Sequence, residues 1–327
     1  MALPLYADLS IPYQPAELVH ELVDFACELG FERIAINNVV HSLQSGKGKK
    51  KGGKPQSDIQ PPSQILLNEA SITALKAKRP KFHLVSRFTT VLDDVSNTHR
   101  LGSPEVQSYD IIAVQPTDEK TFQLACSTLD VDIICLNFTE QLGFVPKRPL
   151  LKLAIKRGIH FEIVYSPALK DNSVKRNIIS NAMSLISVSR GKGVIISSGA
   201  EKLIDLRSPW DVVNLGKLFG LNPLQAKDSI CKNCRAVLKH AEARKTCKTV
   251  VSVADVSHLK PDEKWILQSS RTEAMHEQQK QHSDQSSEEE DSDNDDGDDD
   301  SDESESSKEE NESYDHSKKK KIKLDIS

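Results

Sequence analysis

The sequence predicts an α/β fold in which parallel strands close into a barrel. Seven short apolar segments alternate with segments of helical periodicity along the chain, ahead of a highly charged C-terminal tail. None of the seven shows the period-two alternation typical of strands with one solvated face, so we expect both faces of each strand to be buried. The regular spacing favours a closed barrel over an open doubly wound sheet, and no eighth strand is evident. We therefore expect a TIM-like barrel, distorted and with seven parallel strands.

The expected strands are clusters of β-branched and other apolar residues between turn signals. Residues 130–136 contain the continuous apolar run VDIICL, and residues 33–40 contain Ile34, Ile36 and Val39. In chain order, the strands are expected at residues 3–11, 33–40, 82–87, 110–115, 130–136, 160–165 and 193–197.

The helices between the strands are predicted by apolar spacing and by residues that favour helix ends. The helix after the seventh strand is the most clearly marked. Ser208 is a good N-cap, Pro209 suits the first helical position, Asp211 lies three residues after the cap, and Gly220 is placed to end the helix. The expected helices cover residues 15–29, 65–78, 118–129, 149–157, 171–188, 208–220 and 222–245.

The chain of 327 residues is expected to hold one folded domain and one tail. The barrel should cover residues 1–252, with a flexible basic loop at 44–62 that is rich in Gly, Lys and Pro. Residues 253–327 should form a disordered acidic tail, since residues 283–317 alone carry a net charge of −17. The total charge of −5 then leaves +8 on residues 1–282, because the last ten residues carry +4. A basic folded part is compatible with a polyanionic partner, although ordinary surface lysines also explain it.

The tail ends in a basic cluster that resembles a nuclear localisation signal, although isolated basic runs often occur without that role. Serines among the acidic residues make phosphorylation a hypothesis for the same tail. No apolar run is long enough to cross a bilayer, and the scattered cysteines suit a reducing compartment, so we expect a soluble intracellular protein without a membrane partner. The signal consists of Lys318, Lys319, Lys320, Lys321 and Lys323.

No set of catalytic or cofactor-binding residues is evident. Asp8 is the only carboxylate at the expected strand ends, whereas a divalent metal in a hydrolase needs several His, Asp or Glu ligands. Cys231 and Cys234 form a CxxC motif that, with His240 and Cys247, is one alternative zinc set, but the motif is expected within a helix rather than a turn. Nucleotide-binding glycine motifs are absent from the sequence. We expect no catalytic residue, no metal and no cofactor.

Basic residues are placed more favourably, because most of them follow expected strands. Loops after parallel strands meet at one end of a barrel, so these cations should converge and neutralise phosphates. Arg207 should also adjoin a helix N-terminus, where backbone N–H groups attract anions. For any single side chain, a solvated surface charge is the simpler interpretation; the clustering carries the argument. The predicted phosphate-binding residues are Arg87, Arg100, Lys147, Arg148, Lys170, Lys175, Arg176, Lys202 and Arg207, together with Arg235, Arg244 and Lys245 on the last helix.

Several segments resemble one known family. They are YADLSIP, STLDVDIIC, KRP, FEIVYSPALKD, VIISSGAEKLIDLRSPWDVVNLGKLFGL and NCRAVLKHAEARKT, in this order across residues 3–252. Together they are similar to the thirty-kilodalton protein subunit family of ribonuclease P, shared with ribonuclease MRP. The resemblance implies a barrel related to the polymerase and histidinol phosphatase metal hydrolases, with the metal ligands replaced at Asp8, Ser10 and Pro12 and at residues 198–201.

The resemblance also implies a function. An RNA would cleave the 5′ leader from precursor tRNA, and this chain would be an RNA-binding scaffold subunit that contacts precursor tRNA only indirectly. The implied partners are the catalytic RNAs of ribonuclease P and MRP, with a role in pre-rRNA processing for the latter, and a smaller α/β RNA-binding subunit. A nuclear and nucleolar location follows. The alternatives are a free-standing metal-dependent phosphoesterase using Asp8 and Glu201, and a protein-interaction module acting through the acidic tail.

Overall fold

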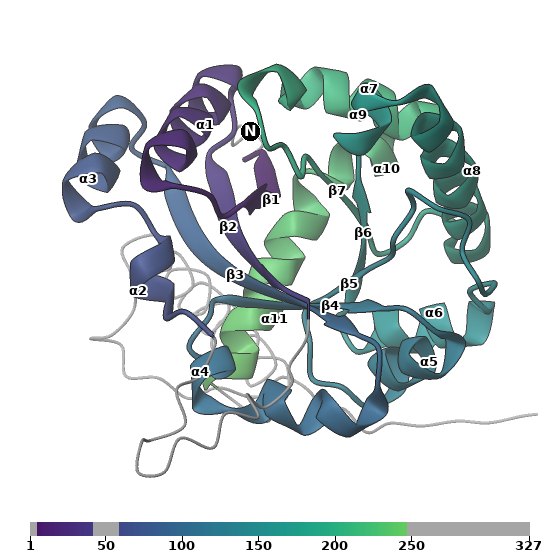
Figure 1. Ribbon diagram of the computed structural model, residues 1–327. Helices are drawn as coiled ribbons and strands as arrows, with labels where there is room; N and C mark the ends of the chain where they lie inside the picture. The colour runs from purple at the N-terminus through teal and green to yellow at the C-terminus, as the bar shows by residue number, and fades with distance from the viewer. Residues whose placement is uncertain (1–4, 42–58, 247–327) are drawn as a thin grey trace, which may run out of the picture. The chain divides into compact units, whose positions relative to one another are not determined.

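The computed structural model describes residues 5–41 and 59–246 of the chain (Figure 1). Most of the predicted basic loop, the predicted acidic tail and the lysine cluster at residues 318–323 lie outside these residues. Within the described part, no helix combines the length and apolarity that a membrane span requires.

Seven strands form a single sheet in which neighbours in the chain are neighbours in space, and every pair is parallel. The predicted distorted seven-stranded α/β barrel is confirmed. The strands occupy the centre of Figure 1 and helices surround them, as expected for strands buried on both faces. The strands are β1 (Ala7–Pro12), β2 (Arg33–Val40), β3 (His83–Leu92), β4 (Ile111–Pro116), β5 (Ile133–Cys135), β6 (His160–Val164) and β7 (Val194–Ser197).

Helices cover the outside of the sheet, and their ends follow the expected residue preferences. The Ser208 hydroxyl accepts a hydrogen bond from the backbone N–H of Asp211 at the start of the helix that Pro209 opens. The helices are α1 (Ala16–Leu29), α2 (Pro62–Ile65), α3 (Glu69–Lys78), α4 (Pro104–Gln107), α5 (Glu119–Ser127), α6 (Arg148–Lys156), α7 (Pro167–Lys170), α8 (Asn172–Ser189), α9 (Pro209–Leu218), α10 (Pro223–Asp228) and α11 (Lys232–Thr246), with 3₁₀ turns η1 (Val95–Gly102) and η2 (Leu203–Asp205).

The gap between β1 and β7 is closed without an eighth strand. The backbone N–H of Ala7 in β1 donates to the carbonyl oxygen of Ile230 at 2.9 Å, and the N–H of Ile196 in β7 donates to that of Ser229 at 3.3 Å. The short segment between α10 and α11 therefore bonds to both edge strands. The prediction of one helix over residues 222–245 is wrong at this point, because this segment leaves the helical conformation to bridge the sheet edges.

Helix α11 then crosses the N-terminal end of the barrel, and Figure 1 shows it passing over the centre of the ring of strands. The Asn233 side chain donates to the carbonyl oxygen of Val194, the first residue of β7. Cys234, Val237 and Ala241 lie on one face of the helix and are buried with the inward-facing side chains of the strands. The helix thus completes the core inside the barrel.

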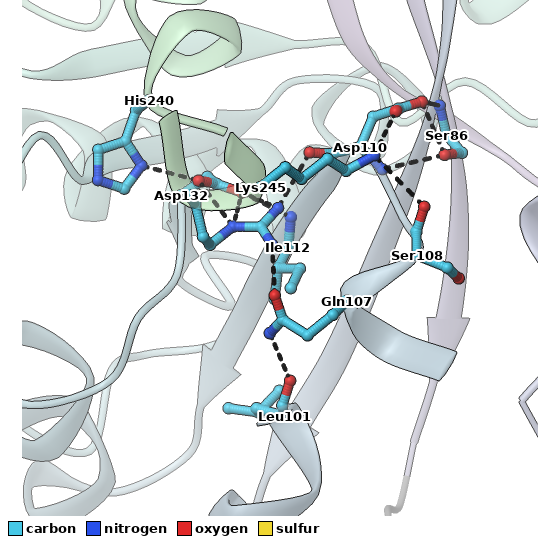
Figure 2. A network of polar contacts seen from close by, with 10 residues as sticks. Ser86, Leu101, Gln107, Ser108, Asp110, Ile112, Asp132, His240 and Lys245 are labelled. Atoms are coloured by element: carbon cyan, nitrogen blue, oxygen red, sulfur yellow. Dashed lines mark hydrogen bonds and ion pairs between the residues drawn. The ribbon is translucent and has the colours of Figure 1, made fainter. Parts of the chain in front are cut away.

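Figure 2 shows the polar contacts that hold the C-terminal half of α11 in place. Asp132, immediately before β5, is fully buried and accepts hydrogen bonds from His240 at 2.7 Å and from Arg244. Arg244 also donates to the carbonyl oxygen of Asp110, just before β4, and Lys245 bonds to the Asp110 carboxylate at 2.7 Å. The hydrogen bond that His240 donates to Asp132 is the main reason that the pKa of His240 is raised, although burial opposes it.

Two further boundaries differ from expectation. The basic loop predicted to extend to residue 62 ends earlier, because Ile59 is buried in the main core and α2 begins at Pro62. Strand β3 continues past the predicted end at Arg87, because Thr89 points into the polar barrel interior and Thr90 is buried on the opposite face of the strand. The 3₁₀ turn and short helix over residues 95–107 were not predicted either.

Candidate nucleic-acid interface

A salt bridge lies inside the barrel, between the middle of β3 and the middle of β6. The two nitrogens Nη1 and Nη2 of Arg87 lie 2.5 and 2.6 Å from the two carboxylate oxygens of Glu162. Both side chains are 1% exposed. The paired, parallel geometry is the strongest form of an arginine–carboxylate contact.

The remaining donors of Arg87 are also satisfied. Nη1 donates to the carbonyl oxygen of Leu9 at 2.7 Å, and Nε donates to the hydroxyl of Thr89 at 3.1 Å. Burial alone would raise the pKa of Glu162, but the charge and hydrogen bonds of Arg87 outweigh burial and lower that pKa. Both groups are therefore ionised at neutral pH. The prediction that Arg87 contacts RNA is wrong, because the strand carries this side chain into the barrel, away from solvent.

Asp8 in β1 is a second buried polar residue, and its side chain bonds to the segment that follows β7. Its Oδ1 accepts hydrogen bonds from the backbone N–H groups of Ser10 at 3.2 Å and Ser198 at 3.0 Å, while Oδ2 is buried without a partner in the described part of the chain. Burial raises the pKa of Asp8, and the bonds from Ser198 and Ser10 offset this only in part. Asp8 thus ties β1 to the end of β7.

These positions do not fit a divalent metal site. The residues matching the ligand positions of the metal hydrolases supply Asp8 as a carboxylate, with Ser10 and Pro12 beside it, whereas several charged or imidazole ligands are needed. Across residues 5–41 and 59–246, no group of three or more His, Cys, Asp or Glu side chains is arranged to hold a metal ion.

The cations predicted on the last helix are separated from the others. Helix α11 lies at the N-terminal end of the barrel, whereas the loops that follow the strands lie at the opposite end. The Arg244 side chain is 1% exposed and bonded to Asp132, so the prediction that it binds RNA is wrong. Arg235 is exposed, and Lys245 is paired with Asp110. A helical pattern indicates that one face is buried but does not indicate which end of the barrel the helix covers.

Eight predicted cations remain at the C-terminal end of the barrel, and we call them the rim residues. Two of them form ion pairs that join neighbouring loops. Lys147 lies 2.7 Å from Glu119 at the start of α5, and Lys170 lies 2.6 Å from Glu201 in the loop after β7. The loops are thereby braced against one another. The rim residues are Arg100, Lys147, Arg148, Lys170, Lys175, Arg176, Lys202 and Arg207.

Arg207 lies at the approach to α9, as predicted, but its guanidinium is partly engaged. Nη1 donates to the carbonyl oxygens of Ile204 and Leu206, both at 2.7 Å. The residue also lines a hollow of about 480 Å³ with Asp211 and Leu215, among others. Arg207 is therefore half-buried and positioned by its own loop, with Asp211 as a competing carboxylate nearby.

Three of the rim residues, Arg148, Arg176 and Lys202, have no partner in the described part of the chain. All three are exposed, and none forms an ion pair or side-chain hydrogen bond with another described residue. Sequence reasoning missed Lys152 and Lys156, which are also exposed and follow Arg148 on α6. Their spacing of four residues was the available signal, because such residues share one face of a helix. The exposed cations of this region thus continue from the rim down the side of the barrel.

The fold and these surfaces define an α/β barrel with a buried salt bridge at its centre and accessible cations around the C-terminal ends of its strands. The sequence profile of the family described as RNase P subunit p30 matches residues 5–246. The chain belongs to this family.

Individual relatives agree with the assignment. The mouse protein "Ribonuclease P protein subunit p30" is 40% identical over 233 residues, which cover 71% of this chain and 83% of the mouse protein. The Saccharomyces cerevisiae protein "Ribonuclease P/MRP protein subunit RPP1" is 32% identical over 196 residues, covering 59% of this chain and 62% of the yeast protein. A chain from a cryo-EM structure of archaeal ribonuclease P with mature tRNA superposes on this protein with a TM-score of 0.55 at 13% identity. The superposition covers 77% of this chain and 99% of the archaeal chain, so the two share a fold.

Proposed function

We propose that this chain is an RNA-binding scaffold subunit of ribonuclease P, the particle that removes 5′ leaders from precursor tRNA, and that an RNA performs the cleavage. The observation that carries the proposal is that Arg148, Arg176 and Lys202, on the rim of a barrel that belongs to the p30 family, are exposed and have no ion-pair partner among the described residues. Such cations neutralise phosphates and so contribute sequence-independent affinity.

The finer parts of the proposal extend the same assignment. The name of the yeast relative supports a second role in ribonuclease MRP and hence in pre-rRNA processing. The proposed protein partner is a smaller α/β RNA-binding subunit, and the proposed contact with precursor tRNA is indirect. The proposed location is the nucleus, including the nucleolus. The lysines at residues 318–323 are the proposed localisation signal, and the boundary near residue 252 is the proposed division between barrel and acidic tail.

The competing phosphoesterase hypothesis requires Asp8 and Glu201 to act on one substrate. Asp8 is 2% exposed, whereas the Glu201 side chain is 59% exposed and paired with Lys170. A reaction centre needs both groups to reach the same reacting atom, so the phosphoesterase hypothesis is the weaker one. A nuclease assay of the purified chain with and without Asp8→Asn separates the two, since turnover that Asp8→Asn abolishes supports the phosphoesterase.

The test of RNA binding uses the full chain, the ribonuclease P RNA of the same organism and a titration of salt. We expect Arg176→Ala with Lys202→Ala to weaken binding and to reduce the slope of log affinity against log salt by about two units, or about one per lost phosphate contact. Arg207→Ala should have a smaller effect because its guanidinium is already engaged. An unchanged slope in the double variant contradicts the assignment of the rim residues.

A further inference from the structure

Helices α6 and α8 are neighbours on the outside of the barrel, and neither contains an acidic residue. Figure 1 places them away from α1, on the far side of the ring of strands. Helix α1 has the opposite composition, because Glu17, Glu21, Asp24 and Glu28 are its charged residues and it contains no lysine or arginine. Helix α1 and the α6–α8 pair therefore carry charges of opposite sign.

The exposed face of α6 is a row of cations. Leu151 and Ala154 are buried against the core, which leaves Arg148, Lys152 and Lys156 exposed toward solvent. Successive members are four residues apart and so lie about 6 Å apart along the helix axis. None of the three forms an ion pair or hydrogen bond with another residue at positions 5–41 or 59–246.

The adjoining face of α8 adds one cation and a row of hydroxyl groups. Arg176, Ser180, Ser184 and Ser187 are exposed and recur at helical spacing. Arg176 has no charged partner in the described part of the chain. Serine hydroxyls and arginine side chains are common donors to phosphate and sugar oxygens. The face thus offers donors and positive charge without a carboxylate to repel a phosphate.

Neither helix contains an aromatic residue. Base stacking, which sequence-specific recognition of single-stranded RNA commonly uses, is therefore not available on this face. The chemistry fits a sugar–phosphate backbone instead.

We propose that the outer face of α6 and α8 is a binding surface for the sugar–phosphate backbone of RNA, separate from the loops around Lys202 and Arg207. The inference rests on the proposed function, since it names a surface for the same RNA partner. It adds Lys152, Lys156 and the α8 serines to the interface and extends it from the rim down the side of the barrel.

The experiment measures binding of the full chain to the ribonuclease P RNA of the same organism over a range of salt concentrations. The test variant is Arg148→Gln/Lys152→Gln/Lys156→Gln, because glutamine removes the charge and retains helix propensity. We expect affinity to fall roughly 3- to 150-fold, with each exposed ion pair contributing about 1.4- to 5-fold, and the salt slope to fall by about two to three units. Lys152→Arg/Lys156→Arg keeps the charge and should retain binding.

The matched control removes three exposed cations from other faces with Lys76→Gln/Lys81→Gln/Lys239→Gln. Equal losses in the test and control variants would overturn the inference, because binding would then follow net charge alone. An unaffected test variant with the same thermal unfolding midpoint as the wild type would also overturn it. Polyglutamate serves as a model of an acidic protein. If the test variant loses as much affinity for polyglutamate as for RNA, the surface is assigned to acidic proteins instead. Absence of RNA binding by the wild type would contradict the proposed function itself.

Discussion

The buried pair of Arg87 and Glu162 makes a quantitative prediction about stability. Removing one partner leaves the other charged, fully buried and without its counterion, since both are 1% exposed. Breaking a buried pair in this way costs about 3–5 kcal/mol. We expect Arg87→Met and Glu162→Leu each to lower the free energy of unfolding by this amount, a large part of the roughly 5–15 kcal/mol available to a domain.

The double variant Arg87→Met/Glu162→Leu should be more stable than either single variant, because no unpaired charge remains and apolar side chains of similar size fill the space. A double-mutant cycle measured by urea denaturation at pH 7 should therefore give a coupling energy of at least about 3 kcal/mol. If a single variant fails to fold, Glu162→Gln offers a neutral partner for the guanidinium and should fall between the wild type and Glu162→Leu. Additive effects, within about 0.5 kcal/mol, would refute the reasoning.

Three further predictions concern single side chains. Asp8→Asn should raise the free energy of unfolding at pH 7 by on the order of 1 kcal/mol. Burial raises the pKa of Asp8, so the ionised side chain destabilises the folded state, whereas the amide is neutral and its oxygen still accepts hydrogen bonds. A thermal midpoint below that of the wild type contradicts this prediction. His240 has a pKa raised above its ordinary value of 6.5, chiefly by its hydrogen bond to Asp132. The stability that protonated His240 contributes is therefore fully present below about pH 6.5 and is lost as pH rises through the raised pKa. Urea denaturation of His240→Ala should accordingly differ most from the wild type at acidic pH, and a constant difference from pH 5 to 9 argues against the linkage. Gly199 has φ +59°, and a Cβ there would clash with Val164 Cγ1, so Gly199→Ala should cost at least about 1–2 kcal/mol. Thermal denaturation measures this cost, and no loss of stability would show that the loop adjusts freely.

The number and order of strands were accessible from the sequence, because strands buried on both faces appear as short apolar runs. Residues 130–136 and 194–196 stand out in this way, and local end signals such as Ser208 before Pro209 locate a helix start without any tertiary contact. Membership of the p30 family was likewise evident from long segments that keep their order along the chain.

The functional surface depended on the tertiary structure. Arg87 follows an apolar run and so resembled the first residue of a loop, but β3 continues to Leu92 and directs this side chain to Glu162 inside the barrel. The partner gave one local signal, a carboxylate within the apolar segment FEIV. Which charged side chains pair across the barrel depends on the register of strands that are distant in sequence, and periodicity within one strand does not contain that information.

The placement of α11 was decided in the same way. Its spacing of apolar residues predicted a helix with one buried face, but not that this face closes the N-terminal end of the barrel. That placement depends on the backbone bonds of Ser229 and Ile230 to the two edge strands and on the buried carboxylate of Asp132. The sequence by itself therefore determined the seven strands, most of the longer helices and the family to which the chain belongs. Only the tertiary structure decided which cations are buried counterions and which remain exposed to solvent, because burial and pairing arise from contacts between segments that are far apart in the chain.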